Sequence, residues 1–319
     1  MKRTVKPNRG DTTKSAGAKR ASASTGKIHP VIIYPFKPVG HYRDLQALYS
    51  LVERLDADRE RYARPITVMD RKTYYSQAQA KAFRAFRDRT LTRCSDILDA
   101  WCADTCQMWY AGLGAAFERG KPGDVYWLIP GDFNYGTHVG QEVLGQLHDL
   151  PEIILELNQD LCIGEIETGY GHPKHLIDTY GTFALLYNWF PAEAQEIRQY
   201  TEQPRSEFFA LRHEFLGEML TQRWYPYEQT AVMLLRAVFK RRRISRFFVG
   251  NVSDLPEGRE SLASALQQVE RTERVLKTLW RDRHESRTGW IKRYRDLEAD
   301  SEQIRRTALT ILHNLLPGQ

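Results

Sequence analysis

Two aspartates follow apolar segments that have the length of buried strands. Asp70 comes directly after the apolar run 66–69, and Asp132 lies three residues beyond the run 125–129. The carboxyl ends of parallel strands meet at one edge of an open sheet, and ligands bind at that edge. A carboxylate there can accept hydrogen bonds from a nucleobase or a ribose, and another can hold a divalent cation against a diphosphate. The pair therefore predicts a nucleotide site, although an aspartate after a strand also serves as a plain turn or helix-capping residue.

The elements that would position these aspartates alternate between strands and helices. Apolar runs bounded by proline, glycine or aspartate predict strands at 31–34, 66–69, 125–129, 161–164 and 244–249. Helical spacing of apolar residues predicts helices over 45–55, 76–119, 141–149 and much of the chain after residue 170, with one or two long helices from 260 to 315. This alternation predicts an α/β fold with a mostly parallel sheet.

The positive charge of the chain is concentrated at its beginning. Residues 1–27 hold eight lysines or arginines and a single acid, Asp11, so this segment alone exceeds the net charge of +6. The segment lacks apolar periodicity, which predicts a disordered tail. Such a tail either attracts polyanions or acts as a solubilising leader. We therefore expect a disordered basic tail at 1–27, a catalytic domain at 28–255 and a helical extension at 256–319.

Composition also bears on the compartment and on partners. The sequence has no run of about 20 apolar residues, the length of a membrane-spanning helix. Its four cysteines match no zinc spacing, which favours reduced thiols in a cytoplasmic protein, although the basic, acid-poor start also fits an organelle transit peptide. The apolar stripe along 260–315 predicts packing on the body or on a partner, including a second copy of the chain. The basic run 240–243 suits either a phosphate clamp or a solvated turn.

Seven segments, taken in order, carry a resemblance to a known family. They are Val31–Pro35, Ile66–Asp70, Met108–Gly120, Gly123–Asp132, Pro204–Arg212, Tyr227-Glu228 and Arg243–Gly250. This layout, over about residues 30–255, resembles the GT-A glycosyltransferases, particularly the broad family-2 group. Pro130 stands where that group has the first aspartate of an Asp-x-Asp motif, and the helical stretch at 74–106 exceeds the usual spacing.

The resemblance implies a fold, a donor and a metal. The fold would be a GT-A, Rossmann-like α/β sheet with flanking helices and a C-terminal helical extension. The donor would be a nucleotide-diphosphate sugar, with Asp70 reading the nucleoside and Asp132 binding Mn²⁺ or Mg²⁺. The residues that the resemblance places at the donor are Pro35, Asp70, Gly131, Asn134 and Arg205. The acceptor would offer a hydroxyl or a phosphate, on a small molecule, a glycan or a lipid-linked phosphate.

The resemblance also implies a base that removes the proton of the acceptor hydroxyl. Glu228 aligns with an acidic position on the acceptor side, and Glu207 is the second candidate. An acid at the start of a helix is alternatively explained by the helix dipole. Two other functions stay open at this point. A nucleotidyltransferase also uses carboxylate-bound metal, although the loop 37–43 has only one glycine, and the loss of an aspartate at Pro130 would also fit a non-catalytic binding module.

Overall fold

The computed structural model describes most of the chain. The described residues are 26–34, 43–71, 84, 87, 91–100, 105–131, 133, 135, 137–167, 173–225, 228–251 and 262–315. Pro35, Asp132 and Asn134, which the sequence places at the donor, lie outside these residues, as does most of the predicted tail.

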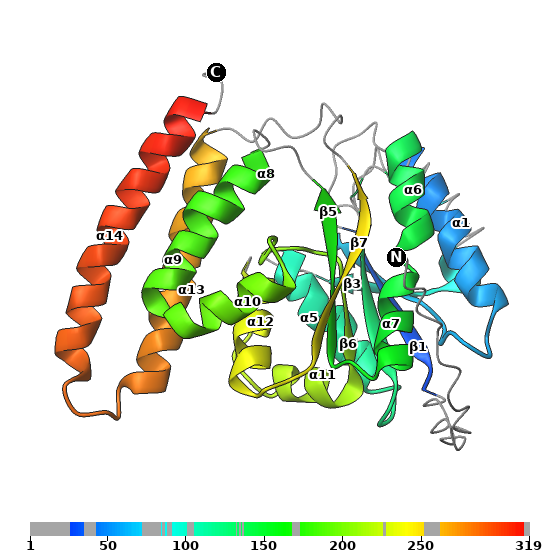
Figure 1. The fold of residues 1–319 in the computed structure, drawn as a ribbon. Helices are drawn as coiled ribbons and strands as arrows, with labels where there is room; N and C mark the ends of the chain where they lie inside the picture. The colour runs from blue at the N-terminus through cyan, green and yellow to red at the C-terminus, as the bar shows by residue number, and fades with distance from the viewer. Residues whose placement is uncertain are drawn as a thin grey trace, which may run out of the picture.

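Within the described residues, seven strands form one sheet in the order β3-β2-β1-β4-β6-β5-β7 (Figure 1). The strands are β1 Ile28–Tyr34, β2 Ile66–Asp70, β3 Asp96–Ala100, β4 Val125–Pro130, β5 Leu161–Glu167, β6 Phe209–Arg212 and β7 Ile244–Asn251. Strand β6 runs antiparallel to both β4 and β5, and every other neighbouring pair is parallel. The predicted mostly parallel α/β sheet is therefore confirmed.

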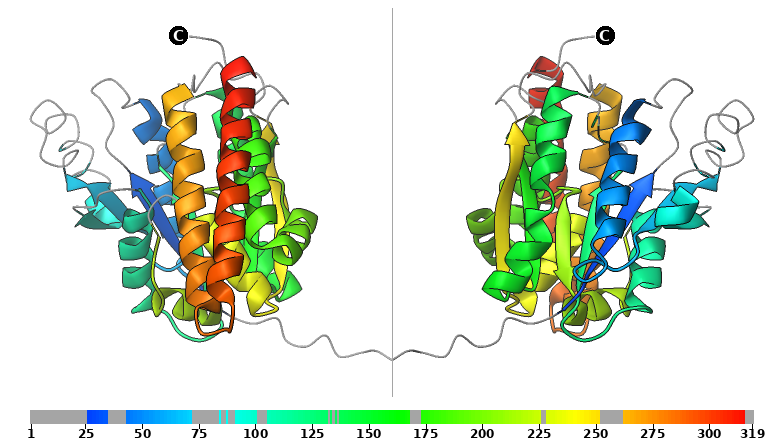
Figure 2. Two further views of the ribbon diagram at one scale, coloured as in Figure 1. Left: turned by 90° about the vertical axis from the view of Figure 1, so that its left-hand side faces the viewer. Right: turned by 90° about the vertical axis from the view of Figure 1, so that its right-hand side faces the viewer.

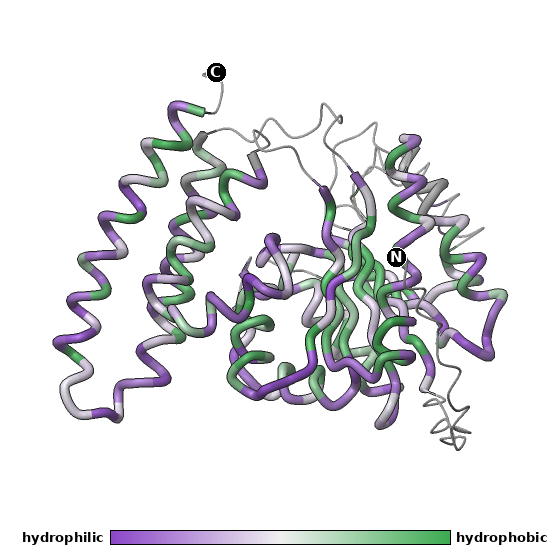
Figure 3. The backbone as a smooth tube through the Cα atoms, in the orientation of Figure 1, coloured by the Kyte–Doolittle hydropathy of each residue, from purple (hydrophilic) through white to green (hydrophobic). Residues whose placement is uncertain are grey.

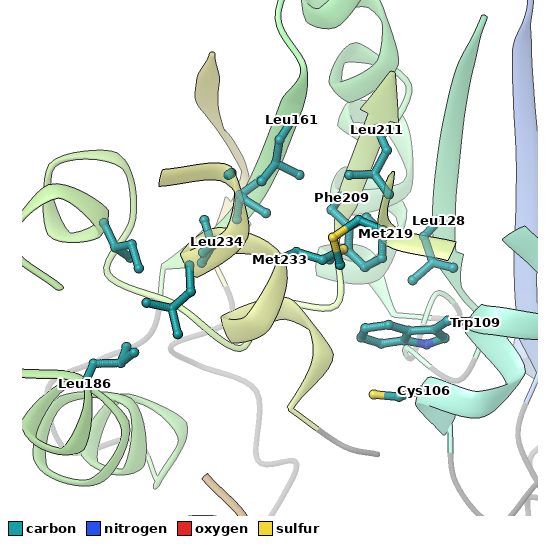
Figure 4. Close-up of a cluster of buried hydrophobic side chains, with 14 of the residues drawn as sticks. Cys106, Trp109, Leu128, Leu161, Leu186, Phe209, Leu211, Met219, Met233 and Leu234 are labelled. Carbon is teal, nitrogen blue, oxygen red and sulfur yellow. The ribbon is translucent and has the colours of Figure 1, made fainter. Parts of the chain in front are cut away.

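Both faces of the sheet are covered by helices, which explains why its central strands read as continuous apolar runs. One face packs on α5 (Thr105–Phe117), α11 (His213–Leu220) and α12 (Gln229–Phe239), and the other on α1 (Arg43–Ala57), α6 (His138–Gln146) and α7 (Asp149–Leu157). Successive side chains alternate between the faces, so Leu128 belongs to the first core and Trp127 to the second. Figure 4 shows part of the first core, with Trp109 of α5 beside Leu128 and Phe209.

The C-terminal helices form a hairpin against the body of the protein. Helix α13 (Leu262–His284) turns at Gly289, whose φ of 77° suits glycine, into α14 (Trp290–Leu315). Both helices pack on α9 (Ala184–Trp189) and on the preceding π-helix η2 (Ile177–Phe183), and α14 lies outermost (Figure 2). The Trp189 indole donates to the Ser301 hydroxyl at 3.1 Å. Hydrophobic and hydrophilic residues alternate along both helices (Figure 3), and the apolar stripe faces the body.

Three further helices complete the described chain. They are the short α4 (Thr92–Cys94), α8 (Pro173–Leu176) and α10 (Pro191–Tyr200). None of the helices in the described ranges is both long and apolar enough to cross a membrane. The three described cysteines form no disulfide with one another; Cys106 and Cys162 are buried and Cys94 is partly buried.

Two strands of the sheet are not predicted by the sequence patterns. The stretch 76–119 was predicted to be helical, but it contains β3, which pairs in parallel with β2 from Ile66↔Asp96 to Asp70↔Ala100. This edge strand is only half-buried and has just two central apolar residues, so it leaves no continuous apolar run. Strand β6 is four residues long and is fully buried between two antiparallel neighbours, so its alternation cannot be seen in the sequence.

Removal of residues 1–25 is expected to leave the melting temperature nearly unchanged, because this segment is basic, Ser-rich and without apolar periodicity. A truncation at the predicted boundary, residue 27, would in contrast remove contacts with the folded domain. The Lys27 amide donates to the Asp124 carboxylate at 2.9 Å, and its ammonium donates to the Arg59 carbonyl at 2.8 Å. Removal of residues 1–27 should therefore lower the melting temperature, since a hydrogen bond to a charged group contributes about 1.5–3 kcal/mol. Thermal unfolding of the two truncations tests this difference, and equal melting temperatures would contradict it.

Candidate functional site

The carboxyl ends of four parallel strands lie in register at one edge of the sheet. Ile33 of β1 pairs with Pro130 at the end of β4, and Tyr34 pairs with Met69, one residue before Asp70. Asp70 is half-buried. Because neighbouring strands are about 4.8 Å apart, Asp70 and the end of β4, two strands away, are separated by about 10 Å. The edge therefore places Asp70 and Gly131 about 10 Å apart, a separation that is compatible with the predicted nucleotide site.

Gly131 allows the chain to turn away from β4 without losing contact with β1. Its amide donates to the Ile33 carbonyl at 2.6 Å. A Cβ at this position would lie 2.5 Å from that carbonyl oxygen and 3.2 Å from the Tyr34 ring. Only glycine therefore fits the close approach of the two backbones at this strand end.

Gly131→Ala is expected to destabilise the fold by about 1–3 kcal/mol, the usual cost of overpacking a site that cannot relax. It should also weaken nucleotide binding, because the turn after β4 would be displaced. Gly145→Ala is the matched control, since a Cβ on Gly145 of α6 meets nothing within 4 Å. Denaturant unfolding of both variants measures the difference. Equal stability of the two variants would show that the Gly131 backbone has room to move.

Hydrogen bonds and an aromatic contact stabilise the turn after β4. The buried Tyr135 hydroxyl donates to the Pro130 carbonyl at 2.7 Å, and the Thr137 hydroxyl caps α6 by accepting from the Gly140 amide at 3.0 Å. The Phe133 ring packs edge-on against Phe208, with ring centroids 5.6 Å apart. This aromatic contact joins the turn after β4 to the segment that precedes β6.

The segment 201–208 is fastened to the carboxyl end of β5. The Ser206 hydroxyl donates to the Gly164 carbonyl at 2.6 Å, and the Thr230 hydroxyl donates to the Ser206 carbonyl at 2.7 Å. The Ile166 amide donates to the Gln203 side chain at 3.1 Å. Arg205 and Glu207 are therefore held at the same edge of the sheet as the turn after β4.

A network of buried charges surrounds Arg205. Its Nε donates to Glu228 Oε2 at 2.9 Å, and its Nη1 lies 3.8 Å from Asp178 Oδ1. Arg271 Nε lies 3.8 Å from the other Glu228 oxygen, and Lys174 Nζ lies 3.4 Å from Asp178 Oδ2. The Glu228 and Asp178 side chains are each 1% exposed and that of Arg205 is 13% exposed. Five charges from five segments thus meet at the carboxyl edge.

Glu228 occupies the N-cap position of α12 but makes no capping hydrogen bond with its side chain. Burial raises the pKa of its carboxyl group, and the charges of Arg205 and then Arg271 oppose that rise. The Glu228 carboxylate pairs with the two arginines and does not cap the helix, although the helix dipole also favours an acid at this position. A carboxylate that is paired in this way and withheld from solvent is poorly placed to take a proton from a bound substrate. Glu207, in contrast, has an exposed side chain.

The other predicted donor residues, Pro35 and Asn134, and the predicted metal ligand Asp132 lie outside the described residues, and their placement stays a prediction. Asp178 and Arg271 were not predicted. They come from η2 and α13, far from Arg205 in the chain, so no local motif marks them. The dense polar segment 164–175, which includes Lys174, is the one sequence signal that points toward this network.

No protein-family model matches the sequence, and a search of curated proteins finds no match. Solved structures of similar fold include glucosyl-3-phosphoglycerate synthase from Mycobacterium tuberculosis. Its complex with Mn²⁺, UDP and glucosyl-3-phosphoglycerate has a TM-score of 0.54 and 14% identity, over 83% of this chain and 87% of that one. Its complex with phosphoglyceric acid has a TM-score of 0.54 and 15% identity, over 80% of this chain and 81% of that one. Its complex with Mn²⁺, UDP-glucose and glycerol 3-phosphate has a TM-score of 0.53 and 14% identity, over 83% of this chain and 86% of that one.

The chain has the GT-A fold of the nucleotide-diphospho-sugar transferases. The sheet order, the single antiparallel strand β6 and the flanking helices agree with this assignment, and the fold expected from the resemblance is confirmed. At 14–15% identity the likeness establishes the fold alone.

Proposed function

We propose that the protein is a glycosyltransferase that moves a sugar from a nucleotide-diphosphate donor to a hydroxyl or phosphate acceptor. The observation that supports this most is the arrangement of the carboxyl edge. The ends of β2 and β4 lie about one nucleoside apart at that edge. The Phe133–Phe208 contact joins this half of the edge to the segment that carries Arg205 and Glu207. The residues proposed to bind the donor and those proposed to bind the acceptor are thus adjacent.

The donor is proposed to bind across β2, β1 and β4. Asp70 would accept hydrogen bonds from the nucleoside, and Gly131 would let the backbone approach the diphosphate. Pro35 and Asn134 are assigned to the same donor from sequence alone. The similar M. tuberculosis enzyme binds UDP and UDP-glucose, according to its complexes. A uridine nucleotide is therefore the first donor to examine.

Mn²⁺ or Mg²⁺ is the proposed metal, and the complexes of the similar enzyme contain Mn²⁺. Within the described ranges, no three His, Cys, Asp or Glu residues gather into a metal site. A cation that bridges protein and diphosphate needs only one or two protein carboxylates, because phosphate oxygens and water supply the remaining ligands. The proposed ligand set, Asp132 with the donor diphosphate, fits that mode. When bound, the metal would neutralise the charge of the leaving diphosphate.

For the acceptor side, we propose different tasks for the two glutamates. Glu228 holds Arg205 in place through a charge-assisted hydrogen bond of 2.9 Å, so it is a positioning residue. Glu207 is exposed on the same segment and is the first candidate for the base that deprotonates an acceptor hydroxyl. Arg205 is proposed to face the donor, with its orientation fixed by Glu228 and Asp178.

Thermal unfolding in the presence of nucleotide sugars tests the proposed function. The full-length protein would be heated with UDP-glucose and other nucleotide sugars, each with and without Mn²⁺. A ligand at a hundredfold excess over its Kd stabilises a protein by about 2.7 kcal/mol, which gives a visible shift in melting temperature. We expect a shift for at least one donor that depends on Mn²⁺. The absence of a shift for every donor would contradict the proposal and favour a scaffold without donor binding.

A further inference from the structure

A second pocket lies at the opposite edge of the sheet from the proposed donor site. Strand β6 ends at Arg212 beside Val125, the first residue of β4, and α11 begins directly after it. Helix α12 ends at Phe239, shortly before β7 starts beside the first residue of β5. In Figure 1 these helices accordingly lie below the strands, whose tips point up. The pocket has a volume of about 450 Å³ and is lined by residues of α11, α12 and α13.

The lining of this pocket carries an excess of positive charge. Four cations, Arg223, Arg236, Lys240 and Arg283, face two acids. Both acids have other partners, since Glu218 pairs with Arg242 and Asp282 pairs with its neighbour Arg281. Over the ranges that the structure describes, none of the four lining cations forms an ion pair. Among the described residues, the pocket therefore presents four cations without an ion-pair partner.

Arg236 is the most informative of these cations. Its side chain is half-buried on α12, and its Nη2 donates only to the Arg223 carbonyl, at 3.1 Å. Its Nη1 lies 4.0 Å from the Met219 sulfur. Burial lowers the pKa of the guanidinium, opposed only by the nearby Tyr225. Arginine nevertheless stays charged at neutral pH. A partly desolvated cation without a counter-ion is costly, and an incoming anion would remove that cost.

The walls of the pocket combine these cations with aromatic rings. The Arg283 guanidinium lies over the Phe239 ring at 3.9 Å, and that of Arg223 lies over the Tyr225 ring at 5.1 Å. Such cation–π contacts hold flexible cations in place before a ligand arrives. Phe215 and Leu279 add apolar surface. Apolar walls with a few converging charged groups are typical of small-molecule sites, as is a volume of about 300–1,000 Å³.

We propose that this pocket binds a small organic anion, a phosphate ester with an apolar or aromatic group. The phosphate would contact Arg236 and Arg223, and the apolar group would lie against Phe215 and Leu279. Such a ligand would bridge α12, which has Glu228 at its N-cap, and α13, which carries Arg271 near its middle. Its binding is therefore expected to raise the melting temperature. This ligand site is separate from the donor site and does not depend on glycosyl transfer.

The test uses phenyl phosphate as the probe and the full-length protein. Calorimetric titration should show saturable binding to the wild type. Arg236→Met should weaken binding at least about tenfold, because a hydrogen bond to a charged group contributes about 1.5–3 kcal/mol. Arg274→Met is the charge-matched control, since Arg274 is exposed on α13 and does not line the pocket. It should bind within about twofold of the wild type, because it leaves the contacts of the pocket intact.

Further measurements keep the proposal falsifiable. Arg236→Met removes an unpaired cation, so its melting temperature without ligand should equal or exceed that of the wild type. Arg223→Ala, at an exposed position, should weaken binding without affecting folding. The proposal would be overturned by the absence of saturable binding at millimolar phenyl phosphate, or by equal losses of affinity in the Arg236 and Arg274 variants. It would also be overturned if inorganic phosphate bound as tightly as phenyl phosphate, or if UDP with Mn²⁺ displaced the probe. These readouts do not involve transferase activity, so failure of the proposed function would leave them valid.

Discussion

Asp132→Ala is expected to abolish the Mn²⁺-dependent gain in UDP affinity while the protein stays folded. Asp132 is the proposed metal ligand because, by the resemblance to the GT-A enzymes, it stands at the last position of their Asp-x-Asp motif and Pro130 at the first. A divalent cation that neutralises a diphosphate contributes several kcal/mol. Loss of its protein ligand should therefore lower nucleotide affinity by about two orders of magnitude or more with Mn²⁺ present, and little in its absence. Calorimetric titration of UDP with and without Mn²⁺ measures this effect.

Asp70→Ala is the control for this experiment. Asp70 is proposed to contact the nucleoside, so its replacement should weaken UDP binding by a similar factor with and without the metal. The ratio of the two affinities then separates the roles of the two aspartates. Metal-dependent binding that persists unchanged in Asp132→Ala would remove Asp132 from the metal site.

Glu228→Gln is expected to lower both stability and turnover. The substitution keeps the shape of the side chain and removes a charge that is 1% exposed and faces Arg205 and Arg271. Removal of one partner of a buried ion pair typically costs about 3–5 kcal/mol, because the other charge is left uncompensated. The melting temperature should therefore fall by several degrees. Turnover should fall about 10²-fold, since a displacement of about 1 Å in a positioned group has effects of that size.

Glu207→Gln distinguishes the positioning role from the catalytic one. Loss of an exposed base should reduce turnover by about 10²–10⁴-fold and remove the acidic limb of the pH–rate profile. The loss of stability should be smaller than in Glu228→Gln, because the Glu207 side chain is exposed. Glu228→Gln should retain that acidic limb despite its slower turnover. If Glu207→Gln is fully active and Glu228→Gln loses the acidic limb, Glu228 is the base. If both variants keep full activity, neither glutamate acts in the reaction, as expected for an acceptor that is already anionic.

Four of the five strands that the sequence predicts are mostly buried, whereas the fifth, the edge strand β7, has exposed residues and was predicted from its apolar residues alone. Runs such as Val31–Tyr34 and Val125–Ile129 are apolar throughout, because helices cover both faces of the sheet. Strand β3 was missed because an edge strand buries only part of its surface, and β6 because four residues are too few to show a period. The C-terminal helices were predictable from their helical periodicity, whereas their pairing as a hairpin was not predicted.

Two of the residues proposed to bind the donor are also marked by local sequence patterns. Asp70 follows the apolar run 66–69 directly, and Gly131 lies two residues beyond the run 125–129. Parallel strands bring the ends of these runs together at one edge of the sheet. The order of the seven segments then indicated the GT-A class. These features are local in the chain, so local patterns could reveal them.

The sequence by itself thus determined the α/β class and the basic character of the first residues, and it predicts a nucleotide site at the carboxyl edge of the sheet. Only the tertiary structure decided that Glu228 is buried against Arg205 and Arg271 instead of facing open solvent, and that Arg236 is a half-buried cation without an ion-pair partner among the described residues. The physical reason is that burial and charge compensation depend on which segments meet in space. Arg205, Glu228 and Arg271 are separated by more than twenty residues from one another and come together only when α13 packs on the body.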